Sequence, residues 1–498
     1  MSAPRSSSGD QWPLGRRIPA SLIAVVAAVL AIRIVVGGSV HLTEDEAYYR
    51  LWSMAPALGY YDHPPMIAWW IWLGRHVASD TPLGARLMPI LASATISFLV
   101  FDLARLGGAD RQTASRAGIW YNAMVLVLAG GFLAVPDAPA ALFWTSTLWC
   151  ALRAERAAST SWWLAAGAMA GLAVLSKYSA LFLAPGIFLW LAWTPRGRAE
   201  LGRPGPWLAL AVASLLFSLN LAWNASHHWL TFAKQFGRIA PSHLAPRYLG
   251  EFLLTQALLL NPLIAGFLVR ALATRGKPDR LGATIWPFVA TTAPFVAYLA
   301  FHSLHDRVQA HWPAPVYPAL AIIAAVGADG LAGSPAWTRL RAAAPIFGFG
   351  SCAALIVYLA LLAGVGGLID LARPVRGWPA FAGRLEALRG ERGAAWIGTE
   401  SYGLAAELAD EAAIGAPVLQ IAERERYLGL GPAPPPDLSR PGLLVDLPRR
   451  IDLRALRQCF GRVDPIGKIA RGAPGEVGTP YLVIEVSAPR RDILRAGC

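Results

Sequence analysis

Apolar runs alternate with short polar segments over roughly the first three quarters of the chain. Many of these runs approach the ~20 residues that an α-helix needs to cross the ~30 Å hydrocarbon core of a bilayer. The pattern therefore predicts an α-helical polytopic membrane protein with about eleven transmembrane helices. The expected helices occupy residues 18–38, 84–104, 114–134, 138–154, 161–176, 179–194, 206–223, 252–271, 282–300, 313–331 and 344–366.

A polar and aromatic stretch interrupts this pattern after the first apolar run. It contains residues 43–49 (Thr-Glu-Asp-Glu-Ala-Tyr-Tyr) and residues 60–65 (Tyr-Tyr-Asp-His-Pro-Pro). Carboxylates beside a bilayer are costly unless they are hydrated, paired or bound to a ligand, so loop 41–80 is a candidate membrane-surface active site. Within it, residues 66–74 are too short to span and rich in tryptophan, which predicts an interfacial helix.

Beyond about residue 369 the sequence carries more charged residues, proline and glycine. Short runs with the composition of strands, and one with that of a helix, indicate a small α/β domain there. We therefore expect a membrane domain over residues 1–368 and a soluble α/β domain over 369–498. The expected strands lie at 394–398, 443–446 and 481–486, and the expected helix at 404–412.

Composition agrees with a membrane protein, since 55% of residues are hydrophobic, 15% are charged and the mean hydropathy is +0.44. The net charge of +13 could suit nucleic acid, but the basic residues form short clusters between apolar runs, as topology signals do. We expect no nucleic-acid partner. Alternating the spans from a cytoplasmic N-terminus places the basic clusters in the cytoplasm, and loop 41–65, Lys177, loop 301–312 and the tail domain on the extracytoplasmic side.

The four cysteines give little guidance to function. Cys150 and Cys352 fall in expected helices and are interpreted as packing residues. Cys459 and Cys498 could pair if the tail domain is in an oxidising compartment, and the sequence leaves that open. Neither cysteine nor histidine shows a metal-binding spacing.

Four motifs together resemble a known family. They are an Asp-Glu pair after the first helix (45–46), an aromatic-Asp-His-Pro-Pro segment (61–65), Pro-Asp near a later helix (136–137), and Gly-Leu-Ala-Val-Leu-Ser-Lys (171–177). This pattern resembles the polyprenyl-phosphate-sugar-dependent glycosyltransferases of the GT-C fold. The similar branch comprises aminoarabinose transferases to lipid A, protein O-mannosyltransferases and lipopolysaccharide galacturonosyltransferases. The resemblance covers the membrane part and is strongest over residues 41–200.

The resemblance implies an integral membrane enzyme that transfers a sugar from a polyprenyl-phosphate donor to an acceptor hydroxyl on the extracytoplasmic side. The expected location is the cell inner membrane, with the active site and the tail domain periplasmic. The acceptor would be an envelope glycolipid such as lipid A or lipopolysaccharide, or a protein, and the reaction would invert the anomeric centre. The sequence requires no cofactor.

The resemblance also implies roles for three acidic residues. Asp45 matches the expected base that takes the proton of the acceptor hydroxyl. Glu46 would support Asp45 or bind the acceptor, and Asp137 matches the second acidic position, which would orient a donor or acceptor. These three residues form the predicted catalytic group.

A departing lipid phosphate needs positive charge or hydrogen-bond donors. Lys177 is a lone cation in an apolar context and is the first candidate phosphate ligand. His63 stands where aminoarabinose transferases carry lysine, and Asp62 would set its tautomer or raise its pKa. Tyr61 of the same motif and Arg307 of the later polar loop complete the predicted donor-binding group.

Structural explanations exist for the same residues. Thr43 and Glu46 have the spacing of a helix-capping box, Asp137 could cap the next helix, and Lys177 could extend toward the surface. His311, in the loop of Arg307, is interpreted as an ordinary loop residue.

Other functions remain open. A transporter or flippase would place charges at mid-span and would show inverted repeats, which the sequence lacks. A non-catalytic envelope subunit and a lipid-linked polymer ligase are further alternatives. Metal dependence is also open, because Asp45, Glu46, Asp62 and His63 could hold a divalent cation.

Overall fold

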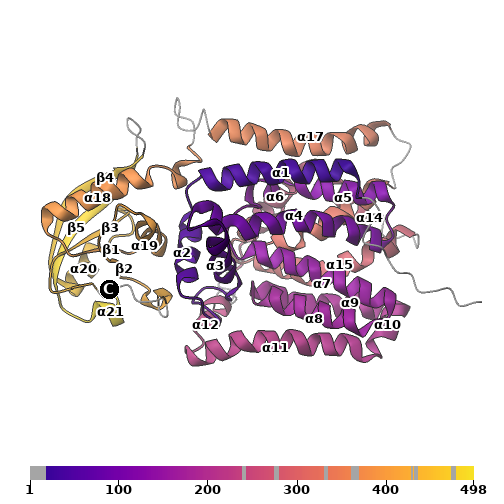
Figure 1. The fold of residues 1–498 in the computed structure, drawn as a ribbon, viewed down its shortest axis with the longest axis horizontal. Helices are drawn as coiled ribbons and strands as arrows, with labels where there is room; N and C mark the ends of the chain where they lie inside the picture. Colours follow the sequence, from indigo (N-terminus) through magenta and orange to yellow (C-terminus); the bar gives the residue numbers. More distant parts are fainter. Residues whose placement is uncertain are drawn as a thin grey trace, which may run out of the picture.

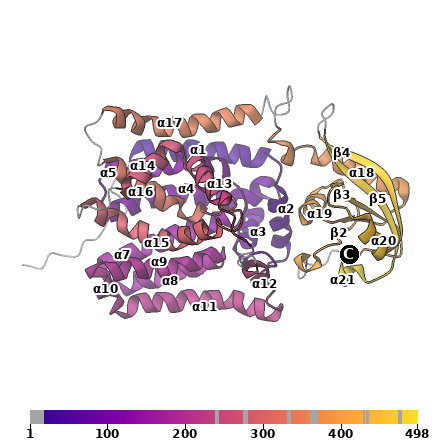
Figure 2. The same cartoon turned by 180° about the vertical axis from the view of Figure 1, so that it is seen from behind.

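The computed structural model describes residues 18–237, 243–273, 280–329, 335–359, 370–427, 430, 436–472 and 478–498 of the 498-residue chain. Long helices lie side by side in the N-terminal part, and a small sheet domain stands at one end of them (Figure 1). Two shorter helices, α2 (Glu44–Met54) and α3 (Met66–Ala78), lie between the long helices and the sheet domain in both views (Figures 1 and 2). The helix expected over residues 66–74 is thus present as α3.

Five described helices are long and apolar enough to cross a bilayer, and a bent pair makes a sixth if it counts as one span. The prediction of an α-helical polytopic membrane protein is confirmed by these five or six helical spans. The number of eleven spans stays a prediction. The five are α1 (Ala20–Ser39), α4 (Pro82–Gly107), α11 (Pro204–Ser226), α15 (Arg280–His302) and α17 (Pro335–Val357), and the pair is α13 (Arg247–Leu259) with α14 (Pro262–Ala273).

The other helices of this part share one apolar core with these spans, in which Trp120, Trp144 and Phe288 are almost fully buried. They are α5 (Arg111–Ala123), α6 (Val125–Gly130), α7 (Asp137–Ala157), α8 (Thr160–Val174), η1 (Tyr178–Phe182), α9 (Leu183–Trp193), α10 (Pro195–Leu201), α12 (Leu230–Phe236), η3 (Ala314–Val316) and α16 (Tyr317–Asp329).

Two expected helices are broken in the structure. The run 114–134 stops before Met124, whose backbone is extended, and resumes as α6. The run 252–271 breaks at Asn261, which has a left-handed φ of 74° and precedes Pro262, and the two halves diverge by 111°. Asparagine tolerates this conformation and proline has no N–H for the helical ladder, so local backbone chemistry overrides a uniform apolar pattern.

The tail folds around a five-stranded sheet of order β2-β1-β3-β5-β4. β1 pairs in parallel with β2 and β3, whereas β5 is antiparallel to β3 and β4. The elements are α18 (Trp378–Arg392), β1 (Trp396–Thr399), α19 (Tyr402–Asp410), β2 (Val418–Gln420), β3 (Gly442–Asp446), α20 (Leu453–Cys459), β4 (Phe460–Arg471), β5 (Thr479–Pro489) and α21 (Ile493–Ala496), with short 3₁₀ turns η6 (Arg373–Val375) and η7 (Arg424–Tyr427).

Three of these strands and one helix confirm the sequence prediction, namely β1, β3, β5 and α19. The prediction omits β2, which has three residues, and β4, in which most positions are exposed so that no apolar run marks the strand. Cys459 and Cys498 form a disulfide with their Cα atoms 5.9 Å apart, which resolves the pairing that the sequence left open. The end of expected helix 344–366 and the expected domain boundary at 368/369 lie outside the described residues.

The tail packs on the first loop through α19 and α2. Gly403, in the first turn of α19, lies so close to Glu44 that a Cβ at this position would be 2.5 Å from a carboxylate oxygen. Arg50 of α2 forms ion pairs with Asp410 of α19 and with Asp80. These contacts hold the tail domain against the polar stretch that the sequence marks as a candidate active site.

Glu407 of α19 is fully buried near this contact, and neither of its carboxylate oxygens accepts a hydrogen bond from a described group. His41 Nδ1 lies 3.4 Å from Oε2. Burial, with the charges of Glu44 and Asp410, raises the pKa of Glu407 from 4.5 to about 10. The folded state therefore keeps a proton that the unfolded state releases, and this stabilisation, complete below pH 4.5, is lost as the pH rises toward 10.

We expect Glu407→Gln, which is neutral at every pH, to raise the melting temperature at pH 8 by about 2–4 °C and to flatten the fall of stability with rising pH. Tryptophan fluorescence during thermal unfolding of the detergent-purified chain between pH 6 and 9 measures this. Glu425→Gln, at an exposed position of the same domain, is the matched control. Parallel pH profiles for wild type and Glu407→Gln would contradict the prediction.

Candidate active site

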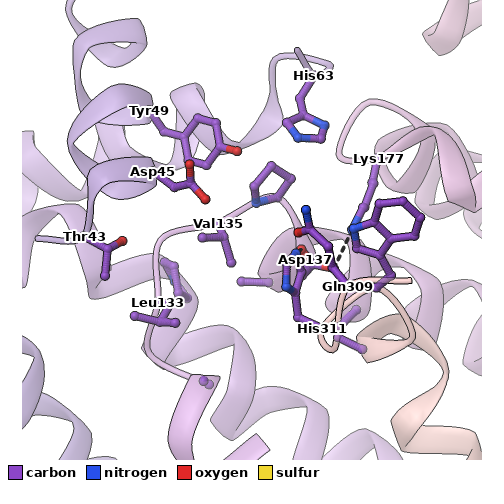
Figure 3. Close-up of a pocket in the computed structure, with 18 of the residues that line it drawn as sticks. Thr43, Asp45, Tyr49, His63, Leu133, Val135, Asp137, Lys177, Gln309 and His311 are labelled. Carbon is purple, nitrogen blue, oxygen red and sulfur yellow. Dashed lines mark hydrogen bonds and ion pairs between the residues drawn. The ribbon is translucent and has the colours of Figure 1, made fainter. Parts of the chain in front are cut away.

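A cavity of about 560 Å³ opens beside the polar stretch. Its wall combines α2, the loop before α3, α4, the segment from α5 to the start of α7, the turn before η1, α12, the loop after α15 and two side chains of the tail. Figure 3 shows Asp45 and Tyr49 on one side of the cavity and Asp137, Lys177 and His311 on the other. Residues far apart in sequence thus meet in one space.

Asp45 occupies the second position of α2 and is exposed to the cavity. A complete capping box fixes the start of the helix: the Thr43 hydroxyl accepts from the Glu46 amide, and the Glu46 carboxylate accepts from the Thr43 amide. The Tyr402 hydroxyl of the tail donates a hydrogen bond of 2.8 Å to Asp45 Oδ1. Asp45 is therefore an oriented carboxylate with access to a ligand.

Glu46 points away from the cavity and is fully buried. Its two oxygens accept hydrogen bonds of 2.8 and 2.6 Å from Arg86, which is also fully buried. Glu46 Oε1 also accepts from the amide of Ala134, at 2.8 Å. Glu46 thus ties α2 to α4 and to the segment before α7. This geometry suits a residue that supports Asp45, the first of the two roles expected from the sequence.

Asp137 and Lys177 form an ion pair across the cavity wall, with 2.7 Å between Lys177 Nζ and Asp137 Oδ1 (Figure 3). Asp137 is the first residue of α7, and Pro136, which makes no side-chain cap, precedes it. The capping explanation for Asp137 is therefore wrong. Lys177 lines the cavity, and its ammonium is bonded to this buried carboxylate. The side chain therefore does not extend toward the surface, the alternative that the sequence offered.

His311 and Gln309 extend the same wall from the loop after α15. His311 Nε2 lies 3.7 Å from Asp137 Oδ2. Burial lowers the pKa of His311, and the Asp137 carboxylate opposes this effect. His311, interpreted from the sequence as an ordinary loop residue, thus lies in the wall of the cavity.

The motif at residues 61–63 divides between the cavity and the tail. His63 and Asp62 line the cavity. Asp62 forms an ion pair with Arg426 of the tail and accepts a hydrogen bond of 3.1 Å from the Tyr48 hydroxyl. Burial raises the pKa of Asp62, with Arg426 opposing this effect.

Tyr61 does not line the cavity but lies against two cations, with its ring centroid 5.2 Å from the Arg426 guanidinium carbon and 5.3 Å from Lys234 Nζ. Arg307 is also outside the cavity wall. Its side chain is exposed and bonded to Glu251, with 2.8 Å between Nε and Oε1. The structure therefore does not bring Arg307 together with the other predicted donor-binding residues.

Two of the polar side chains around the cavity come from the tail and were outside the predicted site. Arg426 stacks over Tyr402, 4.4 Å from its ring centroid, while Tyr402 bonds Asp45 and Arg426 bonds Asp62. The segment before α19, Thr399 to Tyr402, is the only local signal for this contribution that the sequence offers. Nothing near Arg426 in sequence marks it as a site residue.

No group of three or more histidine, cysteine, aspartate or glutamate side chains in the described part of the chain is arranged to hold a metal ion. Three of the four residues that the sequence offers as possible ligands turn to different partners: Glu46 to Arg86, Asp62 to Arg426, and Asp45 to Tyr402. This geometry does not fit a shared cation site among them.

Comparisons with known proteins bear on the fold of the chain. Residues 62–223 match the family described as dolichyl-phosphate-mannose-protein mannosyltransferase. The crystal structure of ArnT from Cupriavidus metallidurans bound to undecaprenyl phosphate superimposes with a TM-score of 0.65 at 16% identity, covering 93% of this chain and 98% of that one. The chain has the GT-C fold. The fold expected from the sequence motifs is thereby confirmed.

Two curated relatives add sequence similarity to this GT-C fold. A lipid A galacturonosyltransferase of Rhizobium johnstonii is 27% identical over 291 residues, which cover 56% of this chain and 59% of that protein. An undecaprenyl phosphate-alpha-4-amino-4-deoxy-L-arabinose arabinosyl transferase of Erwinia tasmaniensis is 27% identical over 319 residues, covering 60% and 56%. The chain therefore aligns with little more than half the length of these relatives.

Proposed function

We propose that this chain transfers a sugar from a polyprenyl-phosphate donor to a hydroxyl of an envelope glycolipid of the lipid A class. The observation that carries the proposal is the shared cavity, in which the exposed carboxylate of Asp45 and the Lys177–Asp137 ion pair lie on different sides (Figure 3). A carboxylate and a cation separated by an open space suit the two ends of a displacement at an anomeric carbon.

Asp45 acts as the general base in this mechanism. It takes the proton of the acceptor hydroxyl while the acceptor oxygen bonds to the anomeric carbon, and the bond from that carbon to the phosphate oxygen breaks. The electron pair leaves with the lipid phosphate, whose charge is stabilised by the Lys177 ammonium and by hydrogen bonds from His63, Gln309 or His311. Direct displacement inverts the anomeric centre.

The substrate classes follow from the names of the relatives together with this chemistry. One relative is named for undecaprenyl phosphate and aminoarabinose, and another for lipid A and galacturonate. A polyprenyl-phosphate sugar as donor and lipid A or a related glycolipid as acceptor fit both. The matched family is named for a protein acceptor, which makes a protein hydroxyl the second candidate.

We place the cavity and the tail domain on the extracytoplasmic side of the inner membrane. The Cys459–Cys498 disulfide supports this orientation, because such bonds persist in oxidising compartments. The clusters of arginine in the loops at the opposite ends of the helices agree with it, since basic loops stay in the cytoplasm. About eleven spans and a soluble domain over residues 369–498 belong to the same proposal.

Mass spectrometry of envelope glycolipids tests the function. A deletion strain should lack one sugar increment on a glycolipid, wild type should restore it, and Asp45→Asn should not, with expression checked for each. If glycoproteins change and glycolipids do not, the acceptor is a protein. If Asp45→Asn restores the increment, the proposed site is wrong, and a transporter role becomes the better explanation.

Lys177→Gln is expected to raise the KM for the lipid-phosphate donor by about 10- to 100-fold, because hydrogen bonds to charged groups contribute about 1.5–3 kcal/mol. Transfer kinetics with purified protein and a polyprenyl-phosphate sugar measure this effect. Lys468→Gln removes the same charge from an exposed strand position and should leave the KM unchanged. An unchanged KM for Lys177→Gln would remove the lysine from the phosphate site.

Tyr402→Phe removes the hydroxyl that donates to Asp45 Oδ1. We expect kcat to fall by about 3- to 10-fold at nearly constant KM, as for the loss of one hydrogen bond of about 1 kcal/mol that orients a reacting group. The same transfer assay, with the melting temperature as a check of folding, measures it. Full activity would show that the tail does not orient the base, and Tyr248→Phe, outside the cavity wall, is the matched control.

A further inference from the structure

Arg33 is a buried cation within the spanning helix α1, and its residue is 3% exposed. Nη1 donates to Ser93 Oγ at 2.7 Å and Nη2 donates to the carbonyl of Val127 at 2.5 Å. Nε has no hydrogen-bond partner, and no ion pair joins Arg33 to a carboxylate of the described residues. An arginine within a span without a counter-charge is costly, which calls for an explanation.

The other arginine and lysine side chains around the cavity are neutralised. Arg86 is bonded twice to Glu46, Lys177 to Asp137, and Arg426 to Asp62 and Glu423. Arg33, in contrast, has only a hydroxyl and a carbonyl as partners among the described residues. In this chain, the other arginine and lysine side chains next to the cavity are thus each paired with a carboxylate, and Arg33 is not.

The partners of Arg33 form the wall of the cavity. Ser93 of α4, Tyr121 of α5, Val127 of α6 and Gly131 all line it. A Cβ at Gly131 would lie 2.5 Å from Arg33 Nη2, so the guanidinium packs directly behind this glycine. The positive charge therefore lies immediately behind the part of the wall that α4, α5 and α6 build.

We propose that Arg33 and Ser93 form a second anion subsite of the cavity, which takes the phosphate group of a lipid substrate. The identity of that substrate rests on the proposed function. A phosphate at this wall supplies the counter-charge that Arg33 lacks, and Ser93, which lines the cavity and accepts a hydrogen bond from Arg33, connects the two. The Ser93 and Tyr121 side chains offer hydroxyl groups at the same place. A donor lipid phosphate and a phosphate of the acceptor glycolipid present the same chemistry.

Direct binding to the purified full-length chain tests the subsite with two probes, undecaprenyl phosphate and lipid A. We expect Arg33→Gln to weaken binding of one of them at least tenfold, and the probe that is affected identifies the source of the phosphate. Arg153→Gln, which removes a partly buried arginine that bonds Asp102, should bind both probes like wild type. Unchanged binding of both probes to Arg33→Gln would overturn the proposal.

Two further variants keep the test decisive if Arg33→Gln does not fold. Arg33→Lys retains the charge and should bind the affected probe within about threefold of wild type. Ser93→Ala removes one hydroxyl at the wall and should weaken the same probe by about threefold, and wild-type binding by Ser93→Ala would then overturn the proposal. If Arg33→Gln weakens probe binding but the wild-type chain has no transferase activity, the subsite is supported and the proposed function is refuted. If the wild-type chain transfers sugar but Arg33→Gln binds both probes normally, the proposed function is supported and the subsite is refuted.

Discussion

Replacement of Asp45 by asparagine should lower kcat for sugar transfer by about 10²- to 10⁴-fold, the range that a positioned general base contributes. The variant keeps the shape of the side chain and an oxygen that can accept from the Tyr402 hydroxyl, but it cannot take a proton from the acceptor. Because Asp45 is exposed to the cavity, folding should be unaffected. The binding of undecaprenyl phosphate should change by no more than a few fold.

Single-turnover kinetics with saturating polyprenyl-phosphate sugar and glycolipid acceptor isolate this effect from binding. Glu44→Gln is a matched control, because it removes a carboxylate one position earlier that contacts Gly403 of the tail and does not line the cavity. Retention of more than about a tenth of the wild-type rate by Asp45→Asn would show that another group, or water, accepts the proton.

The second large effect is expected for the buried pair of Glu46 and Arg86. Both side chains are fully buried and joined by two hydrogen bonds of 2.8 and 2.6 Å. Arg86 also donates to the carbonyls of Gly37, Val40 and His41, which form the end of α1 and the start of the first loop. Removing either partner leaves an uncompensated buried charge, which lowers the free energy of unfolding by about 3–5 kcal/mol.

A double-mutant cycle with Glu46→Leu, Arg86→Met and the combined variant measures this coupling by thermal or denaturant unfolding in detergent. The combined variant should be less destabilised than the sum of the two single variants, because it leaves no unpaired charge. The exposed pair of Arg462 and Asp464 is a suitable control cycle with little expected coupling. Additive effects at Glu46 and Arg86 would show that the pair does not hold the start of α2 in place.

The part of the candidate site that local sequence patterns mark was predictable. The acidic stretch, Asp137 and Lys177 stood out in the sequence because charged residues in an apolar chain are rare, and the structure brings Asp45, Asp62, His63, Asp137 and Lys177 to one cavity. His311, Gln309 and Arg426 gave no such signal, since their loops and tail segments are polar in any case. Arg307 was predicted to bind the donor because it is a charged residue in a polar loop, but in the structure it pairs with Glu251 outside the cavity.

The sequence by itself determined that the chain is an α-helical polytopic membrane protein, that a mixed domain follows the apolar part, and which family motifs the chain carries. These features depend on near neighbours, through hydropathy, helical periodicity and capping. Only the tertiary structure decided that Glu46 faces Arg86 and Asp45 faces the cavity, and that Arg426 of the tail meets Asp62 from the first loop. The physical reason is that a side chain's partner is chosen by packing between elements far apart in the chain, which no local pattern encodes.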